Sequence, residues 1–510
     1  MSASRPLFKS GVAAAVALGM SLAAVPAAPA FAQIGAKNPI TVSHIGVGAT
    51  ATEMSFSWRT TYRGEEYVKF HPRGGVKEER REAAQEADFG AIAYRTNHAT
   101  ITGLKPDTEY TYQIGSNEGG WSEPASFRTQ GAGSSWKFVA LSDAELGVGL
   151  RVKEQAEAWR TAVKQATAKA PDAQFILHAG DQIAAGGDPI SRWAAFFSPE
   201  QLRSYPLALA KGEQESRLTV ERHFKEHVNF PNQEDGSANY YFERNNALFI
   251  VLDSTQNDAA AIARHARFVR QTAAAHGAGK DWIIAVMHHS PYTHGEFGIK
   301  SPEAKRLREG LAPAFSEAGV NLVMGGHEHM YNRSRLMNGT EPVGTDTPAK
   351  SGDVLRPKDG EVLYLTTTTA GGGRYGDVYE TSGAKRTDIT DSSQMEGSEF
   401  ANPAIGVWQQ DRTPDYTVVD VKKNTLTVRT FNVADDSLVD EFTLDRSTTN
   451  PNVPDATPGE GSSAEGSSGE GSSAGKIVGI VIGVLAGLLG ILALLSPLLR
   501  DLAERNGIRL

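Results

Sequence analysis

The chain has 510 residues, of which 40% are hydrophobic and 22% are charged, and its formal net charge is −9 at pH 7. This composition excludes a largely disordered protein, a collagen-like fibre and a protein that crosses a membrane many times, and the acidic balance argues against nucleic acid as a partner. The chain has no cysteines, so any metal ion must be held by His, Asp, Glu, Asn or Gln side chains.

Residues 1–32 have the organisation of a secretory signal peptide. Arg5 and Lys9 give the segment a positive start, residues 12–25 form an apolar stretch, and residues 30–32 (Ala-Phe-Ala) offer small side chains at a cleavage site. We therefore expect this segment to be removed on export. A buried N-terminal helix is the alternative interpretation.

Residues 38–130 are predicted to form an all-β domain. Residues 54–58 and 110–114 alternate apolar and polar side chains, which is typical of strands with one buried face. Residues 99–110 resemble a corner of a fibronectin type III domain, and residues 121–129 resemble its closing strand. We expect such a domain to act as a support or spacer rather than to bind a ligand, because a fold does not by itself define a function.

Residues 134–446 are predicted to form an α/β domain, because short apolar runs alternate with amphipathic segments. The predicted strands include residues 137–141, 175–177, 247–252, 282–286 and 321–324. The predicted helices cover residues 152–169, 259–276 and 302–318. In such a domain, functional side chains gather where neighbouring strands end.

Acidic residues and histidines follow four of these strands. In chain order they are Asp143, Asp181, His288, His289, His327 and His329. Each has an ordinary alternative, since an Asp after a strand often caps a helix and a lone His is often structural. The complete set instead predicts a metal centre, and a mixture of carboxylates and imidazoles fits Fe, Zn or Mn.

The C-terminal part of the chain is predicted to anchor it in a membrane. Residues 447–475 form a Gly/Ser/Glu-rich linker, residues 477–499 an uncharged apolar segment, and residues 500–510 a short tail that would lie in the cytoplasm. An apolar helix of this length spans a bilayer core of about 30 Å. Three glycines in this segment, four residues apart, could form a weak dimer contact: Gly479, Gly483 and Gly487.

The motifs of residues 134–446 resemble those of the calcineurin-like metallophosphoesterases, in particular the purple acid phosphatases. That branch typically shows GDxG, GDxxY, GNH(D/E), VxxH and GHxH in this order. The corresponding segments here are Ser142-Asp143, Gly180-Asp181, Gly212-Glu213-Gln214-Glu215, Val286-Met287-His288-His289 and Gly326-His327-Glu328-His329. Residues 224–253 are also similar, as are residues 363–373, which correspond to a late strand and glycine loop of the family, and the family often carries a preceding fibronectin-like domain.

This resemblance implies a metallophosphoesterase β-sandwich flanked by helices that holds two metal ions. Asp181 would bridge the ions, Asp143 and His329 would hold the first, and His289 and His327 the second. His289 is preferred to His288 because the family places its ligand two residues before a proline. His294 resembles a histidine that contacts phosphate or assists the leaving group.

Three positions depart from the family pattern. Ala184 stands where the family has its tyrosine, so a tyrosinate-to-iron absorption band is not expected. Glu145 stands where other metallophosphoesterases carry a histidine ligand, so it is either a metal ligand or a solvent-exposed cap. Glu213 and Gln214 replace Asn-His: Glu213 can bind metal, whereas Gln214 can bind phosphate but cannot donate a proton.

These observations predict a membrane-anchored, extracellular hydrolase of phosphate esters, with acid-phosphatase or phosphodiesterase activity. In this interpretation a metal-bound hydroxide attacks phosphorus in line, with Gln214 and His294 near the reacting groups. The partners would be a phosphate-ester substrate and, through the C-terminal segment, the membrane. The alternative is a catalytically inactive metallophosphoesterase fold that acts in cell-envelope binding.

Overall fold

A computed structural model describes residues 40–75, 77–88 and 94–447. The predicted signal peptide, most of the linker, the apolar C-terminal segment and the tail lie outside these residues, as do Gly479, Gly483 and Gly487. Within the described ranges, no helix is both long and apolar enough to cross a membrane.

The N-terminal domain consists of β-strands, as the alternating sequence predicts. One layer contains β1 (Ile40–Val47), β2 (Met54–Thr60), β6 (Arg95–Ile101) and β5 (Ala84–Asp88). The other contains β4 (Glu79–Glu82), β3 (Tyr67–Pro72), β7 (Glu109–Ser116), β8 (Gly120–Trp121) and β9 (Ala125–Arg128). Phe56, Tyr112 and Phe127 pack together in its core, so the all-β prediction is confirmed. The closer likeness to fibronectin type III stays a prediction.

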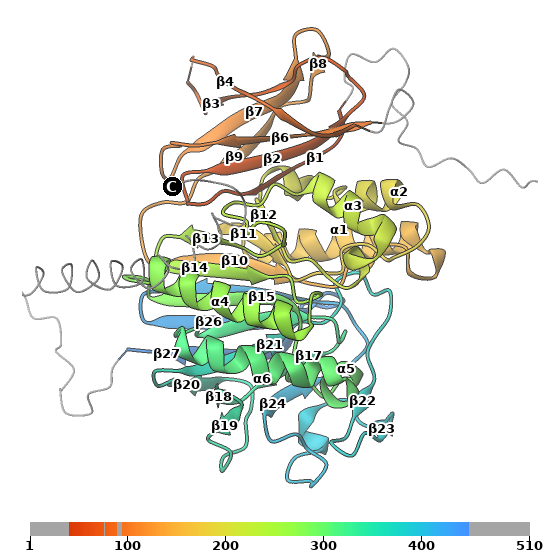
Figure 1. Cartoon of the computed structure of the whole chain (residues 1–510), viewed down its shortest axis with the longest axis vertical. Coiled ribbons are helices and arrows are strands. Elements are labelled where there is room, and N and C mark those ends of the chain that lie inside the picture. Colours follow the sequence, from red (N-terminus) through yellow and green to blue (C-terminus); the bar gives the residue numbers. More distant parts are fainter. Residues whose placement is uncertain (1–39, 76, 89–93, 448–510) are drawn as a thin grey trace, which may run out of the picture. The chain divides into compact units, whose positions relative to one another are not determined.

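The second domain is built around two facing sheets (Figure 1). The strands of the first are, in spatial order, β20 (Asp353–Leu355), β27 (Leu438–Asp445), β26 (Thr425–Asn432), β25 (Asp415–Val421), β10 (Trp136–Leu141), β11 (Ala173–His178) and β12 (Leu207–Leu209). Those of the second are β13 (Tyr240–Arg244), β14 (Ala247–Leu252), β15 (Trp282–His289), β16 (Leu322–Gly326), β21 (Glu361–Thr366), β17 (Tyr331–Ser334) and β24 (Ile405–Gln409). Short strands at the periphery are β18 (Leu336–Asn338), β19 (Glu341–Val343), β22 (Val378–Tyr379) and β23 (Lys385–Arg386).

Aromatic side chains fill the space between the two sheets. The ring of Phe249, on β14, lies 5.4 Å from that of Phe138 and 5.2 Å from that of Phe175, which belong to the opposite sheet. Every residue of β14 is apolar and buried, as expected when both faces of a sheet are covered. The interior therefore has the sandwich arrangement that the resemblance implies.

Helices cover the outer faces of both sheets. The first sheet is covered by α1 (Val152–Lys169) and α2 (Pro189–Phe196), with α3 (Leu218–His227) beside them. The second is covered by α4 (Ala259–His276) and α6 (Pro302–Glu317), which lie side by side in Figure 1, and α5 (Glu296–Lys300) precedes α6. The predicted helices at residues 152–169 and 259–276 coincide with α1 and α4, and α6 ends one residue earlier than predicted.

The two domains share a sheet edge and a buried polar contact surface. Gly46 of β1 pairs in parallel with Leu207 of β12, so the first sheet continues into the N-terminal domain. Beside this junction, the Arg59 guanidinium donates to the carbonyl of Ile190 and lies 2.9 Å from Nε2 of His227. We call the contact surface formed by His44, Arg59, His98, Phe197 and His227 the interdomain interface.

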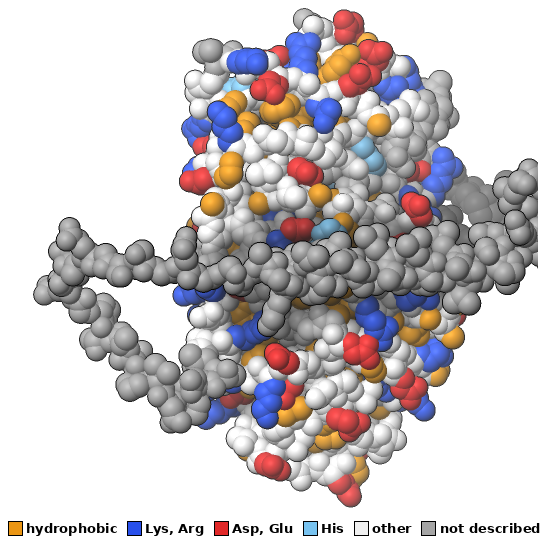
Figure 2. Space-filling view, turned by 60° about the vertical axis from the view of Figure 1, so that its left-hand side comes forward, with side chains coloured by type: hydrophobic (Ala, Val, Ile, Leu, Met, Phe, Trp, Pro, Cys, Tyr) orange, Lys and Arg blue, Asp and Glu red, His pale blue; other side chains and the backbone are white. Residues whose placement is uncertain are grey.

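The face of the molecule seen in Figure 2 carries charged side chains of both signs. Lys and Arg side chains are interspersed with Asp and Glu side chains among the residues that the figure colours. A mixed distribution of this kind gives solubility without a strong field of one sign over that face.

The sheet topology decides where the functional side chains meet. β10, β11 and β12 run in parallel, and so do β14, β15, β16 and β21. The carboxyl ends of parallel strands lie at one edge of a sheet. The segments that follow β10, β11, β12, β15 and β16 are therefore brought close together.

Candidate metal centre

The predicted site residues meet at this edge, and several have an unusual backbone conformation. Asp143, Glu145, Asp181, His327 and His329 have φ angles of 51°, 41°, 53°, 76° and 52°. Left-handed backbone costs about 1–3 kcal/mol per residue outside glycine and is concentrated at functional sites. The fold thus holds five neighbouring polar residues in turns that direct their side chains inward.

The first group of potential ligands joins Asp143 to His329. Nε2 of His329 lies 3.4 Å from Oδ1 of Asp143 and 3.7 Å from Oε2 of Glu145. The Nδ1–H of His329 donates to the carbonyl of Arg374 at 3.0 Å, which leaves the Nε2 lone pair directed at the carboxylates. This tautomer is the one that a metal-binding histidine requires.

The second group surrounds Asp181. Nε2 of His288 lies 3.3 Å from Oδ2 of Asp181 and 3.1 Å from Nδ1 of His327. His288 and His289 each offer a ligand atom within 4.8 Å of one on His327. His289 binds Ser254 through Nδ1, so its Nε2 is left for the centre.

Both neighbouring histidines therefore lie at the centre, although proline spacing had favoured His289 alone. His288 is buried, and its Nδ1–H donates to the carbonyl of Ala179 at 2.9 Å. Asp143, Asp181 and His288 form a second cluster with ligand atoms within 4.8 Å of one another. His288 is a candidate ligand that the sequence analysis set aside.

The altered third motif lies beside the same groups. Oε2 of Glu213 is 3.9 Å from Nδ1 of His327, whereas its Oε1 pairs with Arg217 at 2.7 Å. The backbone N–H of Gln214 donates to Oδ1 of Asp181 at 2.7 Å. Glu213 is thus placed where a carboxylate could reach an ion next to His327.

Glu215, the last residue of the third motif, anchors the loop around Asp181. Its carboxylate accepts hydrogen bonds from the backbone N–H groups of Asp181, Ile183 and Gly212, at 3.0, 3.1 and 3.0 Å. Burial raises the pKa of Glu215 to about 8. This anchoring role was not predicted, although the position of Glu215 as the final acid of the third motif was the available signal.

His294 does not have the free ring nitrogen that its predicted role needs. Its Nδ1–H donates to the carbonyl of Tyr379 at 2.8 Å, and its Nε2 accepts from the backbone N–H of Asn402 at 3.1 Å. Burial lowers the pKa of His294. Both nitrogens are therefore used to hold loops together, and the geometry gives no support to a proton donor at this position.

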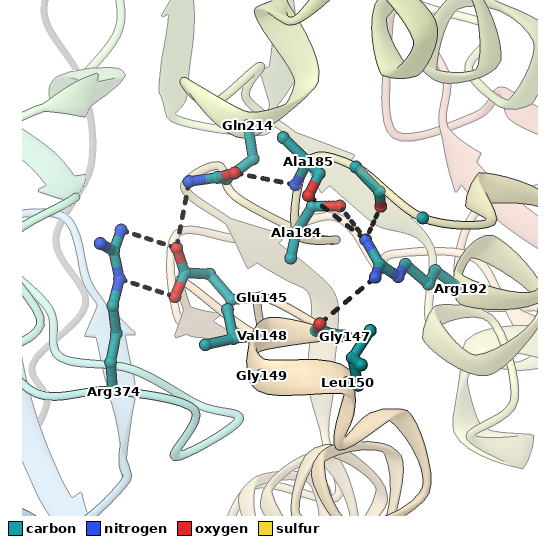
Figure 3. Close-up of a pocket in the computed structure, with 12 residues that line it drawn as sticks. Glu145, Gly147, Val148, Gly149, Leu150, Ala184, Ala185, Arg192, Gln214 and Arg374 are labelled. Carbon is teal, nitrogen blue, oxygen red and sulfur yellow. Dashed lines mark hydrogen bonds and ion pairs between the residues drawn. The ribbon is translucent and has the colours of Figure 1, made fainter. Parts of the chain in front are cut away.

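A cation that the sequence analysis missed lies at the centre. Figure 3 shows Arg374 facing Glu145, with Nη2 2.7 Å from Oε1 and Nε 2.9 Å from Oε2. The Glu145 side chain is fully buried, which excludes the solvent-exposed cap considered above. Arg374 directly follows the glycine loop at residues 371–373, and this position was the signal that could have identified it.

A pocket of about 360 Å³ opens beside Glu145, Gln214 and Arg374. Its walls include residues 147–150 and 184–187. Arg192 connects these walls, donating to the carbonyl of Ala184 at 2.7 Å and to that of Gly147 at 3.3 Å (Figure 3). Ala184, which replaces the family's tyrosine, leaves part of this wall without a large side chain.

The electrostatics of the centre indicate a deficit of positive charge. Burial by itself lowers the pKa of His288 and His329, but the adjacent Asp181 and Asp143 carboxylates raise these values to about 10 and about 9. In the other direction, burial raises the pKa of Asp181, but His288 outweighs it and the pKa is lowered. The carboxylates thus give the centre surplus negative charge, which bound cations would balance.

Two buried atoms test whether a metal ion fits. Oδ2 of Asp181 and Nε2 of His329 make no hydrogen bond, and both belong to fully or almost fully buried side chains. Buried polar atoms without partners are costly, and a cation shared by a carboxylate oxygen and an imidazole nitrogen would satisfy both. Together with the two clusters of ligand atoms described above, these unpartnered atoms fit a pair of metal ions.

Comparisons with known proteins agree with this geometry. Residues 41–129 match the family described as "Purple acid Phosphatase, N-terminal domain", and residues 137–331 match "Calcineurin-like phosphoesterase". No curated protein matches the sequence.

Among solved structures, a purple acid phosphatase from yellow lupin (Lupinus luteus) seeds is similar, with 16% identity over 83% of this chain and 78% of that chain and a TM-score of 0.62. This likeness shows a shared fold. The sensor domain of the anti-sigma factor RsgI4 of Pseudobacteroides cellulosolvens matches only 18% of this chain and 93% of its own, with 22% identity and a TM-score of 0.15.

The two family matches and the shared fold confirm the predicted family, the purple acid phosphatase-like metallophosphoesterases. They also confirm the prediction of a metal-dependent hydrolase of phosphate esters.

Proposed function

We propose that this chain hydrolyses phosphate esters at a two-metal centre in which Asp181 is the shared ligand. The observation that carries this proposal is the position of the Asp181 carboxylate between the two ligand groups. Its Oδ1 is held by the backbone N–H of Gln214, and its buried Oδ2 lies 3.3 Å from His288 without a hydrogen bond. A carboxylate in this position can bridge two ions.

The remaining side chains divide into two sets. Asp143 and His329 would hold one ion, and Glu145 lies within reach of the same place. The second ion would be held by His327 with His288 or His289, and by Glu213 at the rim. When bound, two such ions lower the pKa of a water molecule and stabilise negative charge on phosphoryl oxygens during in-line attack.

The surrounding residues orient the ligands and the substrate rather than move protons. Gln214 has an amide nitrogen 3.4 Å from Glu145 at the pocket, from which it can donate to a phosphoryl oxygen. Neither Gln214 nor the fully bonded ring of His294 supplies a proton to a leaving group. We therefore expect esters with acidic leaving groups, such as aryl phosphates, to react fastest.

The site of action is proposed to be outside the cell, with the chain anchored in the membrane. This proposal rests on the sequence of the export segment at residues 1–32 and of the apolar segment at residues 477–499. Protease added to intact cells should digest the phosphoesterase domain, because it lies outside the cell. In untreated cells, the full chain should be found in the membrane fraction. Release of an intact domain into the soluble fraction would contradict it.

Metal analysis combined with an ester screen tests the proposed activity. We expect the purified protein to bind two transition-metal ions. We also expect it to hydrolyse chromogenic mono- or diesters at one or more points of a pH series that runs from acidic to alkaline. Gln214→His should raise turnover, by about tenfold or more, because it restores a proton donor near the leaving group. A protein that binds two ions but hydrolyses no ester, with or without this substitution, would instead be the inactive envelope-binding module.

A further inference from the structure

The side chain of Arg374 is positioned to bind a ligand as well as to balance Glu145. Its Nη2 and Nε bind the two oxygens of Glu145, at 2.7 and 2.9 Å, and Nη1 makes no hydrogen bond to any residue that the structure describes. The Arg374 side chain is 51% exposed and lines the pocket, whereas Glu145 is fully buried. The guanidinium thus has one nitrogen group directed away from its partner, at the open side of the centre.

The loop that carries Arg374 is held tightly against the metal centre. The backbone N–H of Ala370 donates to the carbonyl of Ser142 at 2.8 Å, and the hydroxyl of Thr369 donates to that of Asp143 at 2.6 Å. A Cβ added at Gly371 would lie 1.9 Å from the carbonyl oxygen of Ala144, so this approach requires glycine. Arg374 is therefore fixed in place by the ligand loops themselves.

The charges around the centre also bear on the substrate. Four carboxylates border it: those of Asp143, Glu145, Asp181 and Glu213. The Glu215 carboxyl group is directed away from the centre, toward three backbone N–H groups. Glu213 is already paired with Arg217 at 2.7 Å, and Arg217 does not line the pocket, so Arg374 is the cation that faces the pocket beside the centre. A phosphodiester presents one negative charge to this guanidinium, whereas a monoester presents a second charge for which the other pocket-lining cation, Arg192, is already occupied by backbone carbonyls.

The pocket supports a compact uncharged substituent on the phosphate. Val148, Leu150, Ala184 and Ala185 contribute apolar surface to its volume of about 360 Å³. The guanidinium of Arg192 is occupied by the carbonyls of Ala184 and Gly147, so it offers little to a second anionic group. The wall therefore fits an aryl or alkyl group better than a further phosphate.

We propose that Arg374, held by Glu145, binds a non-bridging oxygen of the substrate and that the site prefers singly charged phosphodiesters to doubly charged monoesters. This inference rests on the proposed function and specifies its substrate class. Arg374 supplies the positive charge that Gln214 does not, and Glu145 orients the guanidinium instead of binding metal.

The test compares two aryl esters on the metal-loaded full chain, at a pH above the second pKa of the monoester. We expect a higher kcat/KM for bis(4-nitrophenyl) phosphate than for 4-nitrophenyl phosphate. Arg374→Gln should lower both values, by about 10²–10³-fold, because a fixed donor to the phosphoryl group is lost. Glu145→Gln should keep two bound ions and shift the ratio toward the monoester, by about tenfold, because one negative charge is removed.

Two further variants keep this test informative. Arg374→Gln leaves Glu145 buried without its partner, so the double variant Glu145→Gln/Arg374→Gln is measured with it and should lose activity to the same extent. Arg412→Gln is the control: Arg412 is 57% exposed, pairs with Asp377, and should change neither ester's rate. A wild-type preference for the monoester, an unchanged rate in Arg374→Gln, or loss of one ion in Glu145→Gln would overturn the proposal.

Calorimetry tests the contact between Arg374 and phosphate independently of the proposed hydrolysis of phosphate esters. If the wild type hydrolyses neither ester, the proposed function has failed, and titration of inorganic phosphate into the metal-loaded protein decides the Arg374 contact. We expect Arg374→Gln to weaken phosphate binding, by about tenfold or more. Equal affinity in the variant and the wild type would overturn the contact.

Discussion

Buried histidines lie both at the metal centre and at the interdomain interface, and their charged neighbours differ between the two regions. At the metal centre, carboxylates raise the pKa of His288 to about 10 and that of His329 to about 9, against the effect of burial. At the interdomain interface, burial lowers the pKa of His44 to about 3 and that of His98 to about 4. The centre therefore has surplus negative charge beside His288 and His329, although burial lowers the pKa of His289 to about 3 there. At the interface, burial keeps the imidazoles neutral.

Replacing the shared carboxylate would break the centre and leave the interface intact. Asp181→Asn keeps the shape of the side chain but removes the charge that bridges two ions, so we expect loss of at least one ion and a fall in kcat/KM of about 10³-fold or more, about 4 kcal/mol. Asp258→Asn is a matched control, because Asp258 caps α4 and Asn caps helices equally well. Metal analysis and ester hydrolysis measure both, and full metal content in Asp181→Asn would contradict the shared-ligand role.

A substitution at the interdomain interface, Arg59→Met, should lower the stability of the fold without affecting the metal centre. Arg59→Met removes the hydrogen bonds to Ile190 and His227 and the contact of the guanidinium with the Tyr94 ring at 4.1 Å. We expect a loss of about 2–4 kcal/mol in the free energy of unfolding, measured by urea denaturation, with two ions still bound.

Arg128, which forms a solvent-exposed ion pair with Asp107, provides the comparison for Arg59. Arg128→Met on the same domain should cost less than about 1 kcal/mol, because its ion pair with Asp107 is exposed to solvent. Equal losses in the two variants would show that burial at the interface contributes no more than surface charge.

A smaller change distinguishes the two adjacent histidines at the centre. Ser254 lies 3.0 Å from Nδ1 of His289, on the far side of the ring from the centre. If His289 binds metal, Ser254→Ala should weaken the affinity for the second ion, by about 10–100-fold, because the ring loses its orienting partner. Unchanged affinity would assign the ligand role to His288, whose Nδ1–H is bound by the carbonyl of Ala179. Competition with a chromogenic chelator measures the affinity.

Acid should lower the stability contributed by the interdomain interface, because the pKa values of its histidines are lowered by burial. Because the folded-state pKa of His44 lies below its ordinary value, the neutral ring favours folding above pH 6.5, and this contribution is lost as pH falls toward 3. At pH 5 the loss is on the order of 1–2 kcal/mol.

His44→Phe tests this direction. The His44 ring stacks on Phe197 at 4.0 Å with a 2° interplanar angle, so a phenyl ring can take its place. The variant should lose less stability than the wild type between pH 7 and pH 5, as followed by urea denaturation. An identical pH dependence would remove His44 from the explanation.

The elements of the fold that depend on local sequence were predictable. The amphipathic pattern of residues 152–169 and 259–276 matches α1 and α4, and the apolar runs match the central strands. The interdomain interface was not predictable, because His44 and Phe197, or Arg59 and His227, are far apart in the sequence and no local pattern pairs them.

At the metal centre, too, some residues could be predicted from the sequence, whereas others depend on tertiary packing. The residues that follow strand ends, Asp143, Asp181, His327 and His329, could be identified because parallel topology brings such ends together. Arg374 comes from a loop after β21 and reaches Glu145 only through tertiary packing. The occupied ring nitrogens of His294 likewise depend on the carbonyl of Tyr379 and the N–H of Asn402, which motif spacing does not reveal.

The pairing of Gly46 with Leu207 has a practical consequence for work on fragments of this protein. In a chain that begins at residue 134, β12 would become an unpaired edge strand of the first sheet, with its backbone hydrogen-bonding groups exposed. Such edges recruit other strands, so the truncated enzyme is expected to self-associate and precipitate. The N-terminal domain is thus expected to protect this edge of the phosphoesterase domain from self-association.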